Sequence, residues 1–149
     1  EELKKIYTGE ITSWKKFAWK DSSIYLYGRS RNSGTRYFLR EHLLQGESYS
    51  PDMLVFSRTS ALVRAVQKNP FSIGYGGFAY GDDVKLVRVN DVEINPENIR
   101  NDAYPISRYL YLYTVNKPRG RTKKFIDWTM TETGQKIVQE SGLLPIIKF

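Results

Sequence analysis

The sequence has no cysteine and only one histidine among its 149 residues. Without cysteine the chain can form no disulfide framework, no thiolate nucleophile and no cysteine-bound zinc site. Any histidine-based metal site or Ser-His catalytic pair would depend on His42 alone, and a helix-surface or half-buried histidine is the simpler interpretation. These shortages argue against an enzyme and against a resident metal or cofactor.

Long apolar runs are also missing. The longest candidate, residues 110–115, has the length of a strand and falls far short of the roughly 20 residues that cross a bilayer. The chain opens on two glutamates with neither an initiator Met nor an apolar leader, so we expect the native N-terminus to lie outside it. Apolar residues nevertheless make up 40% of the chain, which is enough to close one domain core.

Acidic residues are too few to balance the basic ones. The chain carries 16 Asp and Glu against 23 Lys and Arg, a net charge of +7. This excess favours an anionic partner, whether a nucleic acid, an anionic membrane surface or a small oxyanion. Net charge alone does not choose among the three.

Apolar patterns predict helices interleaved with strands. Spacing and capping residues predict helices at 3–7, from Ser33 or Thr35 to residue 44, from Thr59 to residue 68, and around 125–128 and 137–138. Strands are predicted at 24–27, 72–75, 84–89 and 106–115, with a turn at 90–91. The expected fold is an α/β domain, and the irregular alternation leaves open whether its sheet is purely parallel.

The segment 106–115 carries the clearest strand pattern, because Tyr109, Tyr111 and Tyr113 alternate with two leucines. Apolar residues on both faces predict a central, buried strand. If exposed, the tyrosines would instead suit stacking with single-stranded nucleic acid, which we keep as a less favoured hypothesis. Since burial is predicted, we expect no nucleic acid among the partners.

The segment 28–36, Gly-Arg-Ser-Arg-Asn-Ser-Gly-Thr-Arg, lies between a predicted strand and a predicted helix. The start of a helix offers unpaired backbone N–H groups and the positive end of its dipole, and Ser33 and Thr35 add hydroxyl donors there. Gly34 removes a side chain that would keep an anion from the backbone, and Arg29 can donate two hydrogen bonds to one tetrahedral anion. The segment therefore predicts an oxyanion site.

The first turn of this predicted helix also lacks the acidic residue that usually compensates its dipole. The first acid after Thr35 is Glu41, and Arg36 adds a further positive charge. The alternative is that Ser33 is an ordinary N-cap and the arginines are solvated. Elsewhere, Asp82 and Asp83 fit a solvated turn better than a metal pair, and no nucleophile with a base or metal converges near Ser33.

Five motifs follow one another in an order typical of one family. They are residues 6–14, the Arg29 and Ser33-Gly34-Thr35 group, Ile73-Gly74-Tyr75 after a proline, Tyr104-Pro105-Ile106-Ser107-Arg108, and Gly134-Gln135-Lys136-Ile137-Val138 followed by Gly142 and Pro145. These motifs are spread over nearly the whole chain. Through them the chain resembles the phosphate-binding proteins of ABC-type phosphate transport, which belong to the periplasmic-binding-protein type II superfamily. The resemblance implies a type II-like lobe with a mixed, mainly parallel sheet flanked by helices.

The resemblance also implies a function. A non-catalytic, extracytoplasmic solute-binding protein, periplasmic or anchored at the cell surface, would hold inorganic phosphate through Arg29, Ser33, Gly34 and Thr35 without a cofactor. It would pass the phosphate to an ABC permease or, as the alternative, report its concentration. Some relatives place an acid two residues after the arginine, where it can orient it, but Arg31 stands there in this sequence.

Members of this family have two lobes with the anion between them, and the motifs match the later half. The resemblance therefore implies a phosphate-binding second lobe at residues 1–115 and a helical segment at 116–149 that would return to the other lobe. The N-terminal lobe would be a missing partner. Because the apolar faces of the C-terminal helices would then lack their neighbours, we expect a homodimer or a swapped C-terminal segment.

Overall fold

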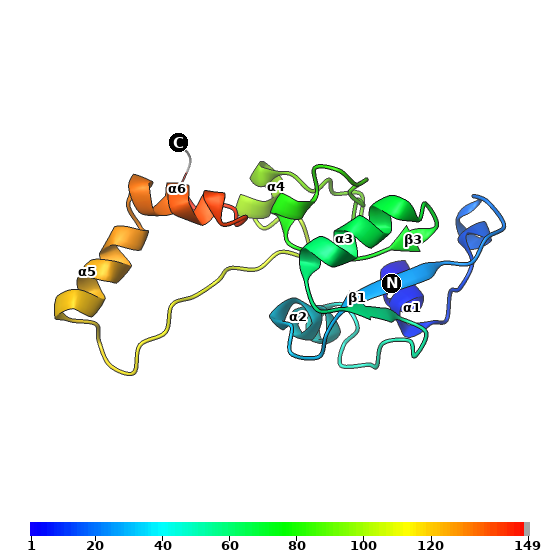
Figure 1. The fold of residues 1–149 in the computed structure, drawn as a ribbon, viewed down its shortest axis with the longest axis horizontal. Helices are drawn as coiled ribbons and strands as arrows, with labels where there is room; N and C mark the ends of the chain where they lie inside the picture. The colour runs from blue at the N-terminus through cyan, green and yellow to red at the C-terminus, as the bar shows by residue number, and fades with distance from the viewer. Residues whose placement is uncertain (148–149) are drawn as a thin grey trace. The chain divides into compact units, whose positions relative to one another are not determined.

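The computed structural model describes residues 1–147 and divides them into two compact units (Figure 1). The first unit is Glu1–Leu86, and the second begins at Val87. The first unit contains the predicted oxyanion segment. The predicted division at residue 115 concerns which residues would return to another lobe, so it stays a prediction.

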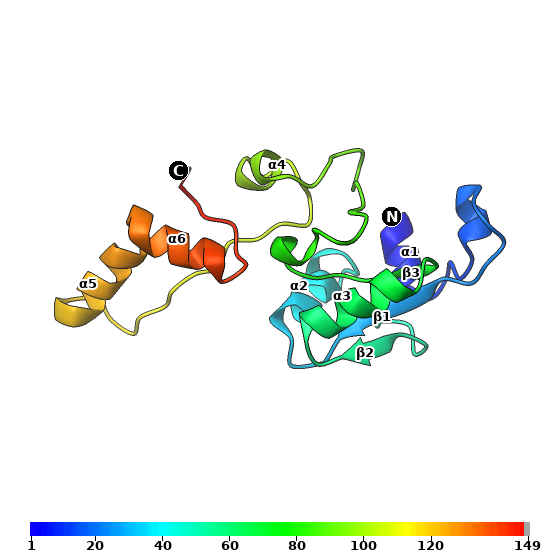
Figure 2. The same cartoon turned by 45° about the horizontal axis from the view of Figure 1, so that its top comes forward.

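A three-stranded parallel sheet, in the order β2-β1-β3, organises the first unit (Figures 1 and 2). Its elements are α1 (Glu2–Thr8), η1 (Trp14–Phe17), β1 (Tyr25–Arg29), α2 (Gly34–His42), β2 (Leu54–Phe56), α3 (Thr59–Lys68), β3 (Ser72–Ile73) and η2 (Phe78–Tyr80). Both α2 and α3 contact the central strand β1. The predicted α/β class is confirmed, and β2 is a strand that the sequence patterns did not indicate.

Local signals explain where the first helices begin and end. Helix α1 stops at Gly9, whose φ of 88° is a left-handed conformation that glycine adopts at little cost. Ser33 caps α2 as predicted, since its Oγ accepts a hydrogen bond from the Arg36 N–H. Thr59 is the first residue of α3 and makes no cap, so its predicted capping role is wrong. Its hydroxyl bonds to an arginine of β1 instead.

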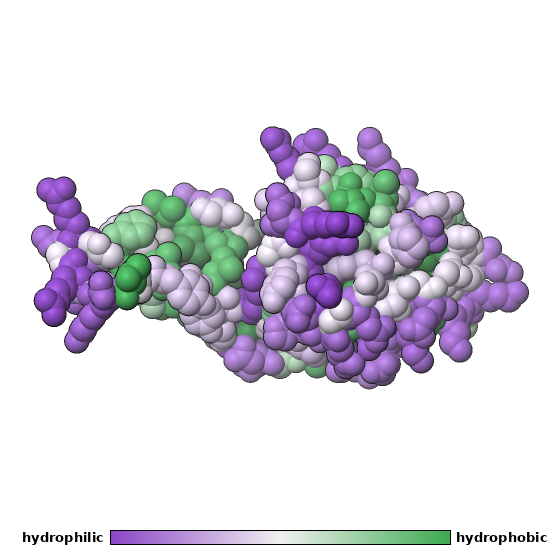
Figure 3. Space-filling view, turned by 90° about the horizontal axis from the view of Figure 1, so that it is seen from below, coloured by the Kyte–Doolittle hydropathy of each residue, from purple (hydrophilic) through white to green (hydrophobic). Residues whose placement is uncertain are grey.

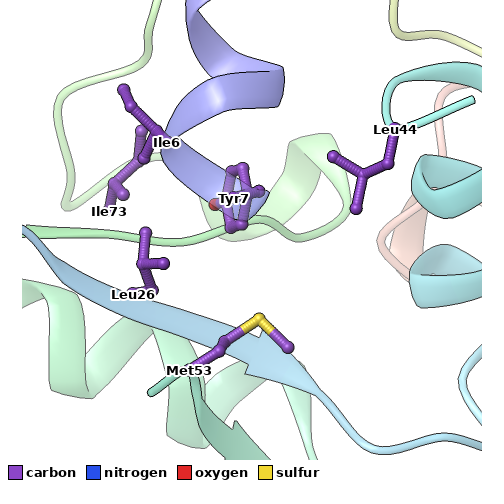
Figure 4. Close-up of a cluster of buried hydrophobic side chains, with 6 residues drawn as sticks. All are labelled: Ile6, Tyr7, Leu26, Leu44, Met53 and Ile73. Atoms are coloured by element: carbon purple, nitrogen blue, oxygen red, sulfur yellow. The ribbon is translucent and has the colours of Figure 1, made fainter. Parts of the chain in front are cut away.

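Six buried side chains form the core of the first unit (Figure 4). They are Ile6, Tyr7, Leu26, Leu44, Met53 and Ile73. Figure 4 shows Leu26 and Met53 pointing to the side of β1 on which Ile6 and Tyr7 of α1 lie. A side chain such as Leu44, which has no exposed surface, contributes about 1.5–3 kcal/mol to folding. Gly28 permits the close approach of Met53 to β1, because a Cβ at this position would collide with the Met53 sulfur.

The second unit contains three helices in its described residues, α4 (Pro96–Arg100), α5 (Gly120–Thr129) and α6 (Glu132–Glu140). Helices α5 and α6 pack together, and the buried Gln135 side chain donates to the Thr129 carbonyl at 2.8 Å. The predicted turn at 90–91 is confirmed, since Val89 and Val92 exchange two backbone hydrogen bonds of 3.0 Å. The strand predicted at 84–89 is wrong, because only an isolated bridge forms there.

The strand predicted at 106–115 is also wrong. Figure 1 draws this segment in yellow without helix or strand, and its side chains are exposed from residue 108 on, reaching 87% at Tyr113 and 100% at Val115. A strand needs a neighbour for its backbone hydrogen bonds, and none pairs with it among residues 1–147. Hydrophobic side chains accordingly come to the surface of the second unit (Figure 3). The predicted burial therefore no longer argues against nucleic-acid stacking.

Candidate oxyanion-binding site

The start of α2 leaves backbone donors open. Ser33 is buried, its N–H donates to the Ser30 carbonyl at 3.0 Å, and its own carbonyl accepts from the Tyr37 N–H at 3.0 Å. The N–H groups of Gly34 and Thr35 follow at the first two helical positions, where no intrahelical acceptor exists. Among residues 1–147 no other acceptor meets them. Gly34 is exposed, so an anion can reach both groups.

The first turn of α2 is positively charged and firmly held. It contains no acidic residue, and the Arg36 Nη1 donates to the Arg29 carbonyl at 2.8 Å. The Arg36 guanidinium also lies 4.5 Å from the ring centre of Tyr49, a cation–π distance, and the Tyr49 hydroxyl donates to the Arg36 carbonyl at 2.9 Å. These contacts fix the helix start against the end of β1.

Arg29, the last residue of β1, is bound by uncharged groups only. Its backbone N–H donates to the Tyr75 hydroxyl at 3.0 Å. In its side chain, Nη2 donates to the Ser57 carbonyl at 3.0 Å and Nη1 donates to the Thr59 Oγ1. The Nε–H is buried and has no partner among the described residues. A buried charged donor without an acceptor is costly, so this group is suited to an incoming anion.

The structure places the predicted site residues on two neighbouring elements. Arg29 ends β1, and the Ser33-Gly34-Thr35 group begins α2, with the Arg36–Arg29 hydrogen bond joining them. The side-chain hydrogen bonds of Arg29 go to Ser57 after β2 and to Thr59 at the start of α3, and not to residues 33–35.

Sequence reasoning missed the partners of Arg29, which are Ser57, Thr59 and Tyr75. Thr59 lies 30 positions further along the chain. The sheet register brings them together, since β1 and β2 pair Arg29 with Phe56 and the residues after β2 then lie beside Arg29. Recognising β2 would have placed Ser57 and Thr59 beside Arg29, whereas Tyr75 follows β3 on the other side of β1.

The other candidate residues lie apart from this site. His42 is exposed at the end of α2, as predicted, with its ring 4.4 Å from that of Phe38. Asp82 and Asp83 are exposed. Within residues 1–147, no three acidic or histidine side chains gather as a metal site, and no helix is long and apolar enough to span a membrane.

Known proteins resemble this chain in sequence. Residues 1–133 match the model of the PBP superfamily domain. The chain is 34% identical to the phosphate-binding protein PstS of Bacillus subtilis, over 98% of this chain and 49% of that protein. It is 30% identical to the PstS of Borreliella burgdorferi, over 98% of this chain and 57% of that protein. The chain thus spans about half the length of these curated relatives.

Solved structures of phosphate-transport proteins also resemble this chain. A substrate-binding protein assigned to phosphate ABC transport in Clostridium perfringens, crystallised with bound phosphate, is 35% identical and superposes with a TM-score of 0.79, covering 99% of this chain and 61% of that one. An ABC-type phosphate transport receptor from Vibrio cholerae gives 29% identity and a TM-score of 0.80, covering 97% and 62%. Since the family model matches most of the sequence and the fold agrees, the chain belongs to the PBP superfamily.

Proposed function

We propose that this chain binds inorganic phosphate by hydrogen bonds, without chemistry, at the start of α2. The observation that carries the proposal is a set of donors that lack protein acceptors: the N–H groups of Gly34 and Thr35 and the buried Nε–H of Arg29. Arg29, Ser33, Gly34 and Thr35 would be its phosphate ligands, and an oxyanion would supply the missing acceptors. The solved relative with bound phosphate supports this choice of anion.

The same groups support binding over catalysis. The side chains here are arginines and hydroxyls, and among the described residues no hydrogen bond joins the Ser33 or Thr35 hydroxyl to an acid or a histidine. Hydrolysis or transfer of a phosphoryl group would need such a base or a metal. The relatives are named as binding and transport proteins, which supports a non-enzymatic role.

We further propose the wider setting that the names of the relatives suggest. The protein would work outside the cytoplasmic membrane, in the periplasm or anchored at the cell surface, and would deliver phosphate to an ABC permease. Residues 1–115 would form one lobe of the site and 116–149 would return to a second lobe, which would face the anion from the other side.

Calorimetric titration with inorganic phosphate tests the site. Arg29→Ala should weaken binding by on the order of 2–4 kcal/mol, because it removes charge-assisted hydrogen bonds. Arg31→Ala is the matched control, since Arg31 lies two residues away, exposed and in the same loop. It should change the affinity only slightly, through screened long-range charge. Unchanged binding by the Arg29→Ala variant would remove Arg29 from the site.

A further inference from the structure

The orientation of Arg29 depends on a residue that neither the motif nor the proposed ligand set includes. The guanidinium is held by two acceptors that follow β2, the Ser57 carbonyl and the hydroxyl of Thr59 at the start of α3. Thr59 opens α3 without capping it, so its oxygen is not engaged by its own helix. We propose that Thr59 is a positioning residue that presents Arg29 to phosphate. This inference rests on the proposed function.

Packing fixes which way Thr59 points. A Cβ added at Gly76 would lie 2.6 Å from the Thr59 Cγ2, so the threonine methyl occupies the space that glycine leaves. A β-branched side chain has few rotamers, and with its methyl directed at Gly76 its hydroxyl is directed at Arg29. Tyr75, the residue before Gly76, accepts the Arg29 backbone N–H. Residues 75 and 76 therefore support both the backbone of Arg29 and Thr59, the partner of the Arg29 side chain.

The uncharged nature of these acceptors has an electrostatic consequence. An acid at this place would orient Arg29 but would also neutralise it and repel an incoming anion. Thr59 orients the guanidinium and leaves its full positive charge available. Among the described residues no carboxylate forms an ion pair with Arg29, and position 31, two residues on, holds an arginine. Thr59 thus supplies orientation without loss of charge.

Three substitutions separate these effects in phosphate titrations of the purified protein. Thr59→Val keeps the shape and removes the acceptor, so phosphate affinity should fall about tenfold. Thr59→Ser keeps the hydroxyl and should stay within about threefold of the unmodified protein. Thr59→Asp keeps an acceptor but adds charge, so it should weaken binding and make it less dependent on salt. Ser60→Ala, next in the same helix turn, is the control and should change nothing.

A double-mutant cycle distinguishes positioning from a general structural role. In an Arg29→Lys background no guanidinium remains to be oriented, so Thr59→Val should cost less than about twofold there. An equal loss in both backgrounds would overturn the inference, because Thr59 would then act through something other than Arg29. If the Thr59→Val variant does not fold, Thr59→Ser still tests the inference. A tenfold loss of phosphate affinity in Thr59→Ser would also overturn it.

The titrations also separate this inference from the function on which it rests. If the unmodified protein binds no phosphate at millimolar concentrations, the proposed function and the role of Thr59 fail together. If it binds phosphate and Thr59→Val binds equally well, only the role of Thr59 fails. Both are supported if the unmodified protein binds phosphate, if Thr59→Val weakens that binding about tenfold, and if the same change costs less than about twofold in the Arg29→Lys background.

Discussion

Three tyrosines from separate parts of the sequence support the proposed site from within the core. The Tyr7 ring meets Tyr49 at 6.2 Å and Tyr75 at 5.7 Å between ring centres, in edge-on geometries. Two of the hydroxyls are used: Tyr75 accepts from the Arg29 N–H, and Tyr49 donates to the Arg36 carbonyl. The Tyr7 hydroxyl is buried without a partner among the described residues. The three tyrosines therefore connect the packed core to Arg29 and Arg36, and the Tyr7 hydroxyl is the polar group of the cluster that this packing leaves without a described partner.

Removing that unpaired hydroxyl should stabilise the fold. Tyr7→Phe keeps the ring contacts and relieves a buried polar group, so we expect the free energy of unfolding to rise by about 1 kcal/mol. Tyr49→Phe is the matched control, since it deletes a hydroxyl that has a partner and should lower the same quantity by about 1 kcal/mol. Urea unfolding at neutral pH measures both. A comparable fall in the two variants would mean that Tyr7 has a partner in solution.

The same cluster predicts a loss of stability in alkali. Burial is the main cause that raises the pKa of both Tyr7 and Tyr49 above the usual value near 10, and the neighbouring Tyr75 adds to it. Above about pH 10 the unfolded chain releases these protons while the folded protein keeps them, so stability is full below pH 10 and falls as the pH rises. Urea midpoints between pH 8 and 11 should show this decline, and it should be shallower in Tyr7→Phe. A parallel decline in the two proteins would contradict the assignment.

Single residues were predictable from the sequence where their partners are close in the chain. Ser33 was found as a cap because its hydrogen bond runs to Arg36, three residues on. Thr59 was placed at the right helix end but given the wrong role, because its partner Arg29 becomes a neighbour only when β1 and β2 pair. Sequence spacing does not encode such contacts, which depend on sheet register.

At the scale of elements, the start of α2 combines a structural role with the proposed binding role, and one substitution can separate the two. Ser33→Asp keeps an N-cap and adds a negative charge that favours the helix dipole, so stability should be retained or rise by about 0.3–1 kcal/mol. The same charge would repel phosphate, and affinity should fall at least about tenfold. Thermal unfolding and calorimetry on one sample measure the two effects. Unchanged phosphate affinity would place the anion elsewhere.

Strands were predicted less well than helices, for a physical reason. Helix α2 carries its own start and end signals, whereas a strand needs a neighbouring strand to satisfy its backbone. Residues 84–89 and 106–115 alternate as strands do, yet no strand pairs with either among residues 1–147. Conversely, the three-residue β2 is apolar at every position and too short to show a strand pattern, although it pairs with β1. Alternation predicts the capacity to form a strand and not the presence of a partner.

At the scale of the whole molecule, the donors of the proposed site all belong to one unit. Gly34, Thr35 and Arg29 belong to the first unit, and phosphate oxygens not bound by them would remain in water, which competes for each hydrogen bond. We therefore expect the 149-residue chain alone to bind phosphate with a dissociation constant of about 1 mM, equivalent to roughly 4 kcal/mol. Calorimetry tests this value. Sub-micromolar binding by this chain would contradict it, because one set of donors would then suffice.

The exposed segment 106–115 leads to the last prediction. Leu110 is 62% exposed, Leu112 is 61% exposed, and the neighbouring exposed tyrosine rings stand 6.3 Å apart, so the segment presents apolar side chains at the surface, and no strand pairs with it among residues 1–147. Such surfaces are relieved by association. We expect sedimentation to detect dimers, or a swapped C-terminal segment, as concentration rises.

Leu110→Lys together with Leu112→Lys should shift that equilibrium towards monomer and reduce binding of a hydrophobic dye, because charges on this surface resist burial. Neither position is among the proposed phosphate ligands, so phosphate affinity should stay unchanged apart from a small gain through added positive charge. Leu86→Lys is the control, because Leu86 is 40% exposed and lies outside the segment. It should leave the monomer–dimer equilibrium unchanged. A monomer at every concentration, without dye binding by the unmodified chain, would show that these apolar side chains are covered within one molecule in solution.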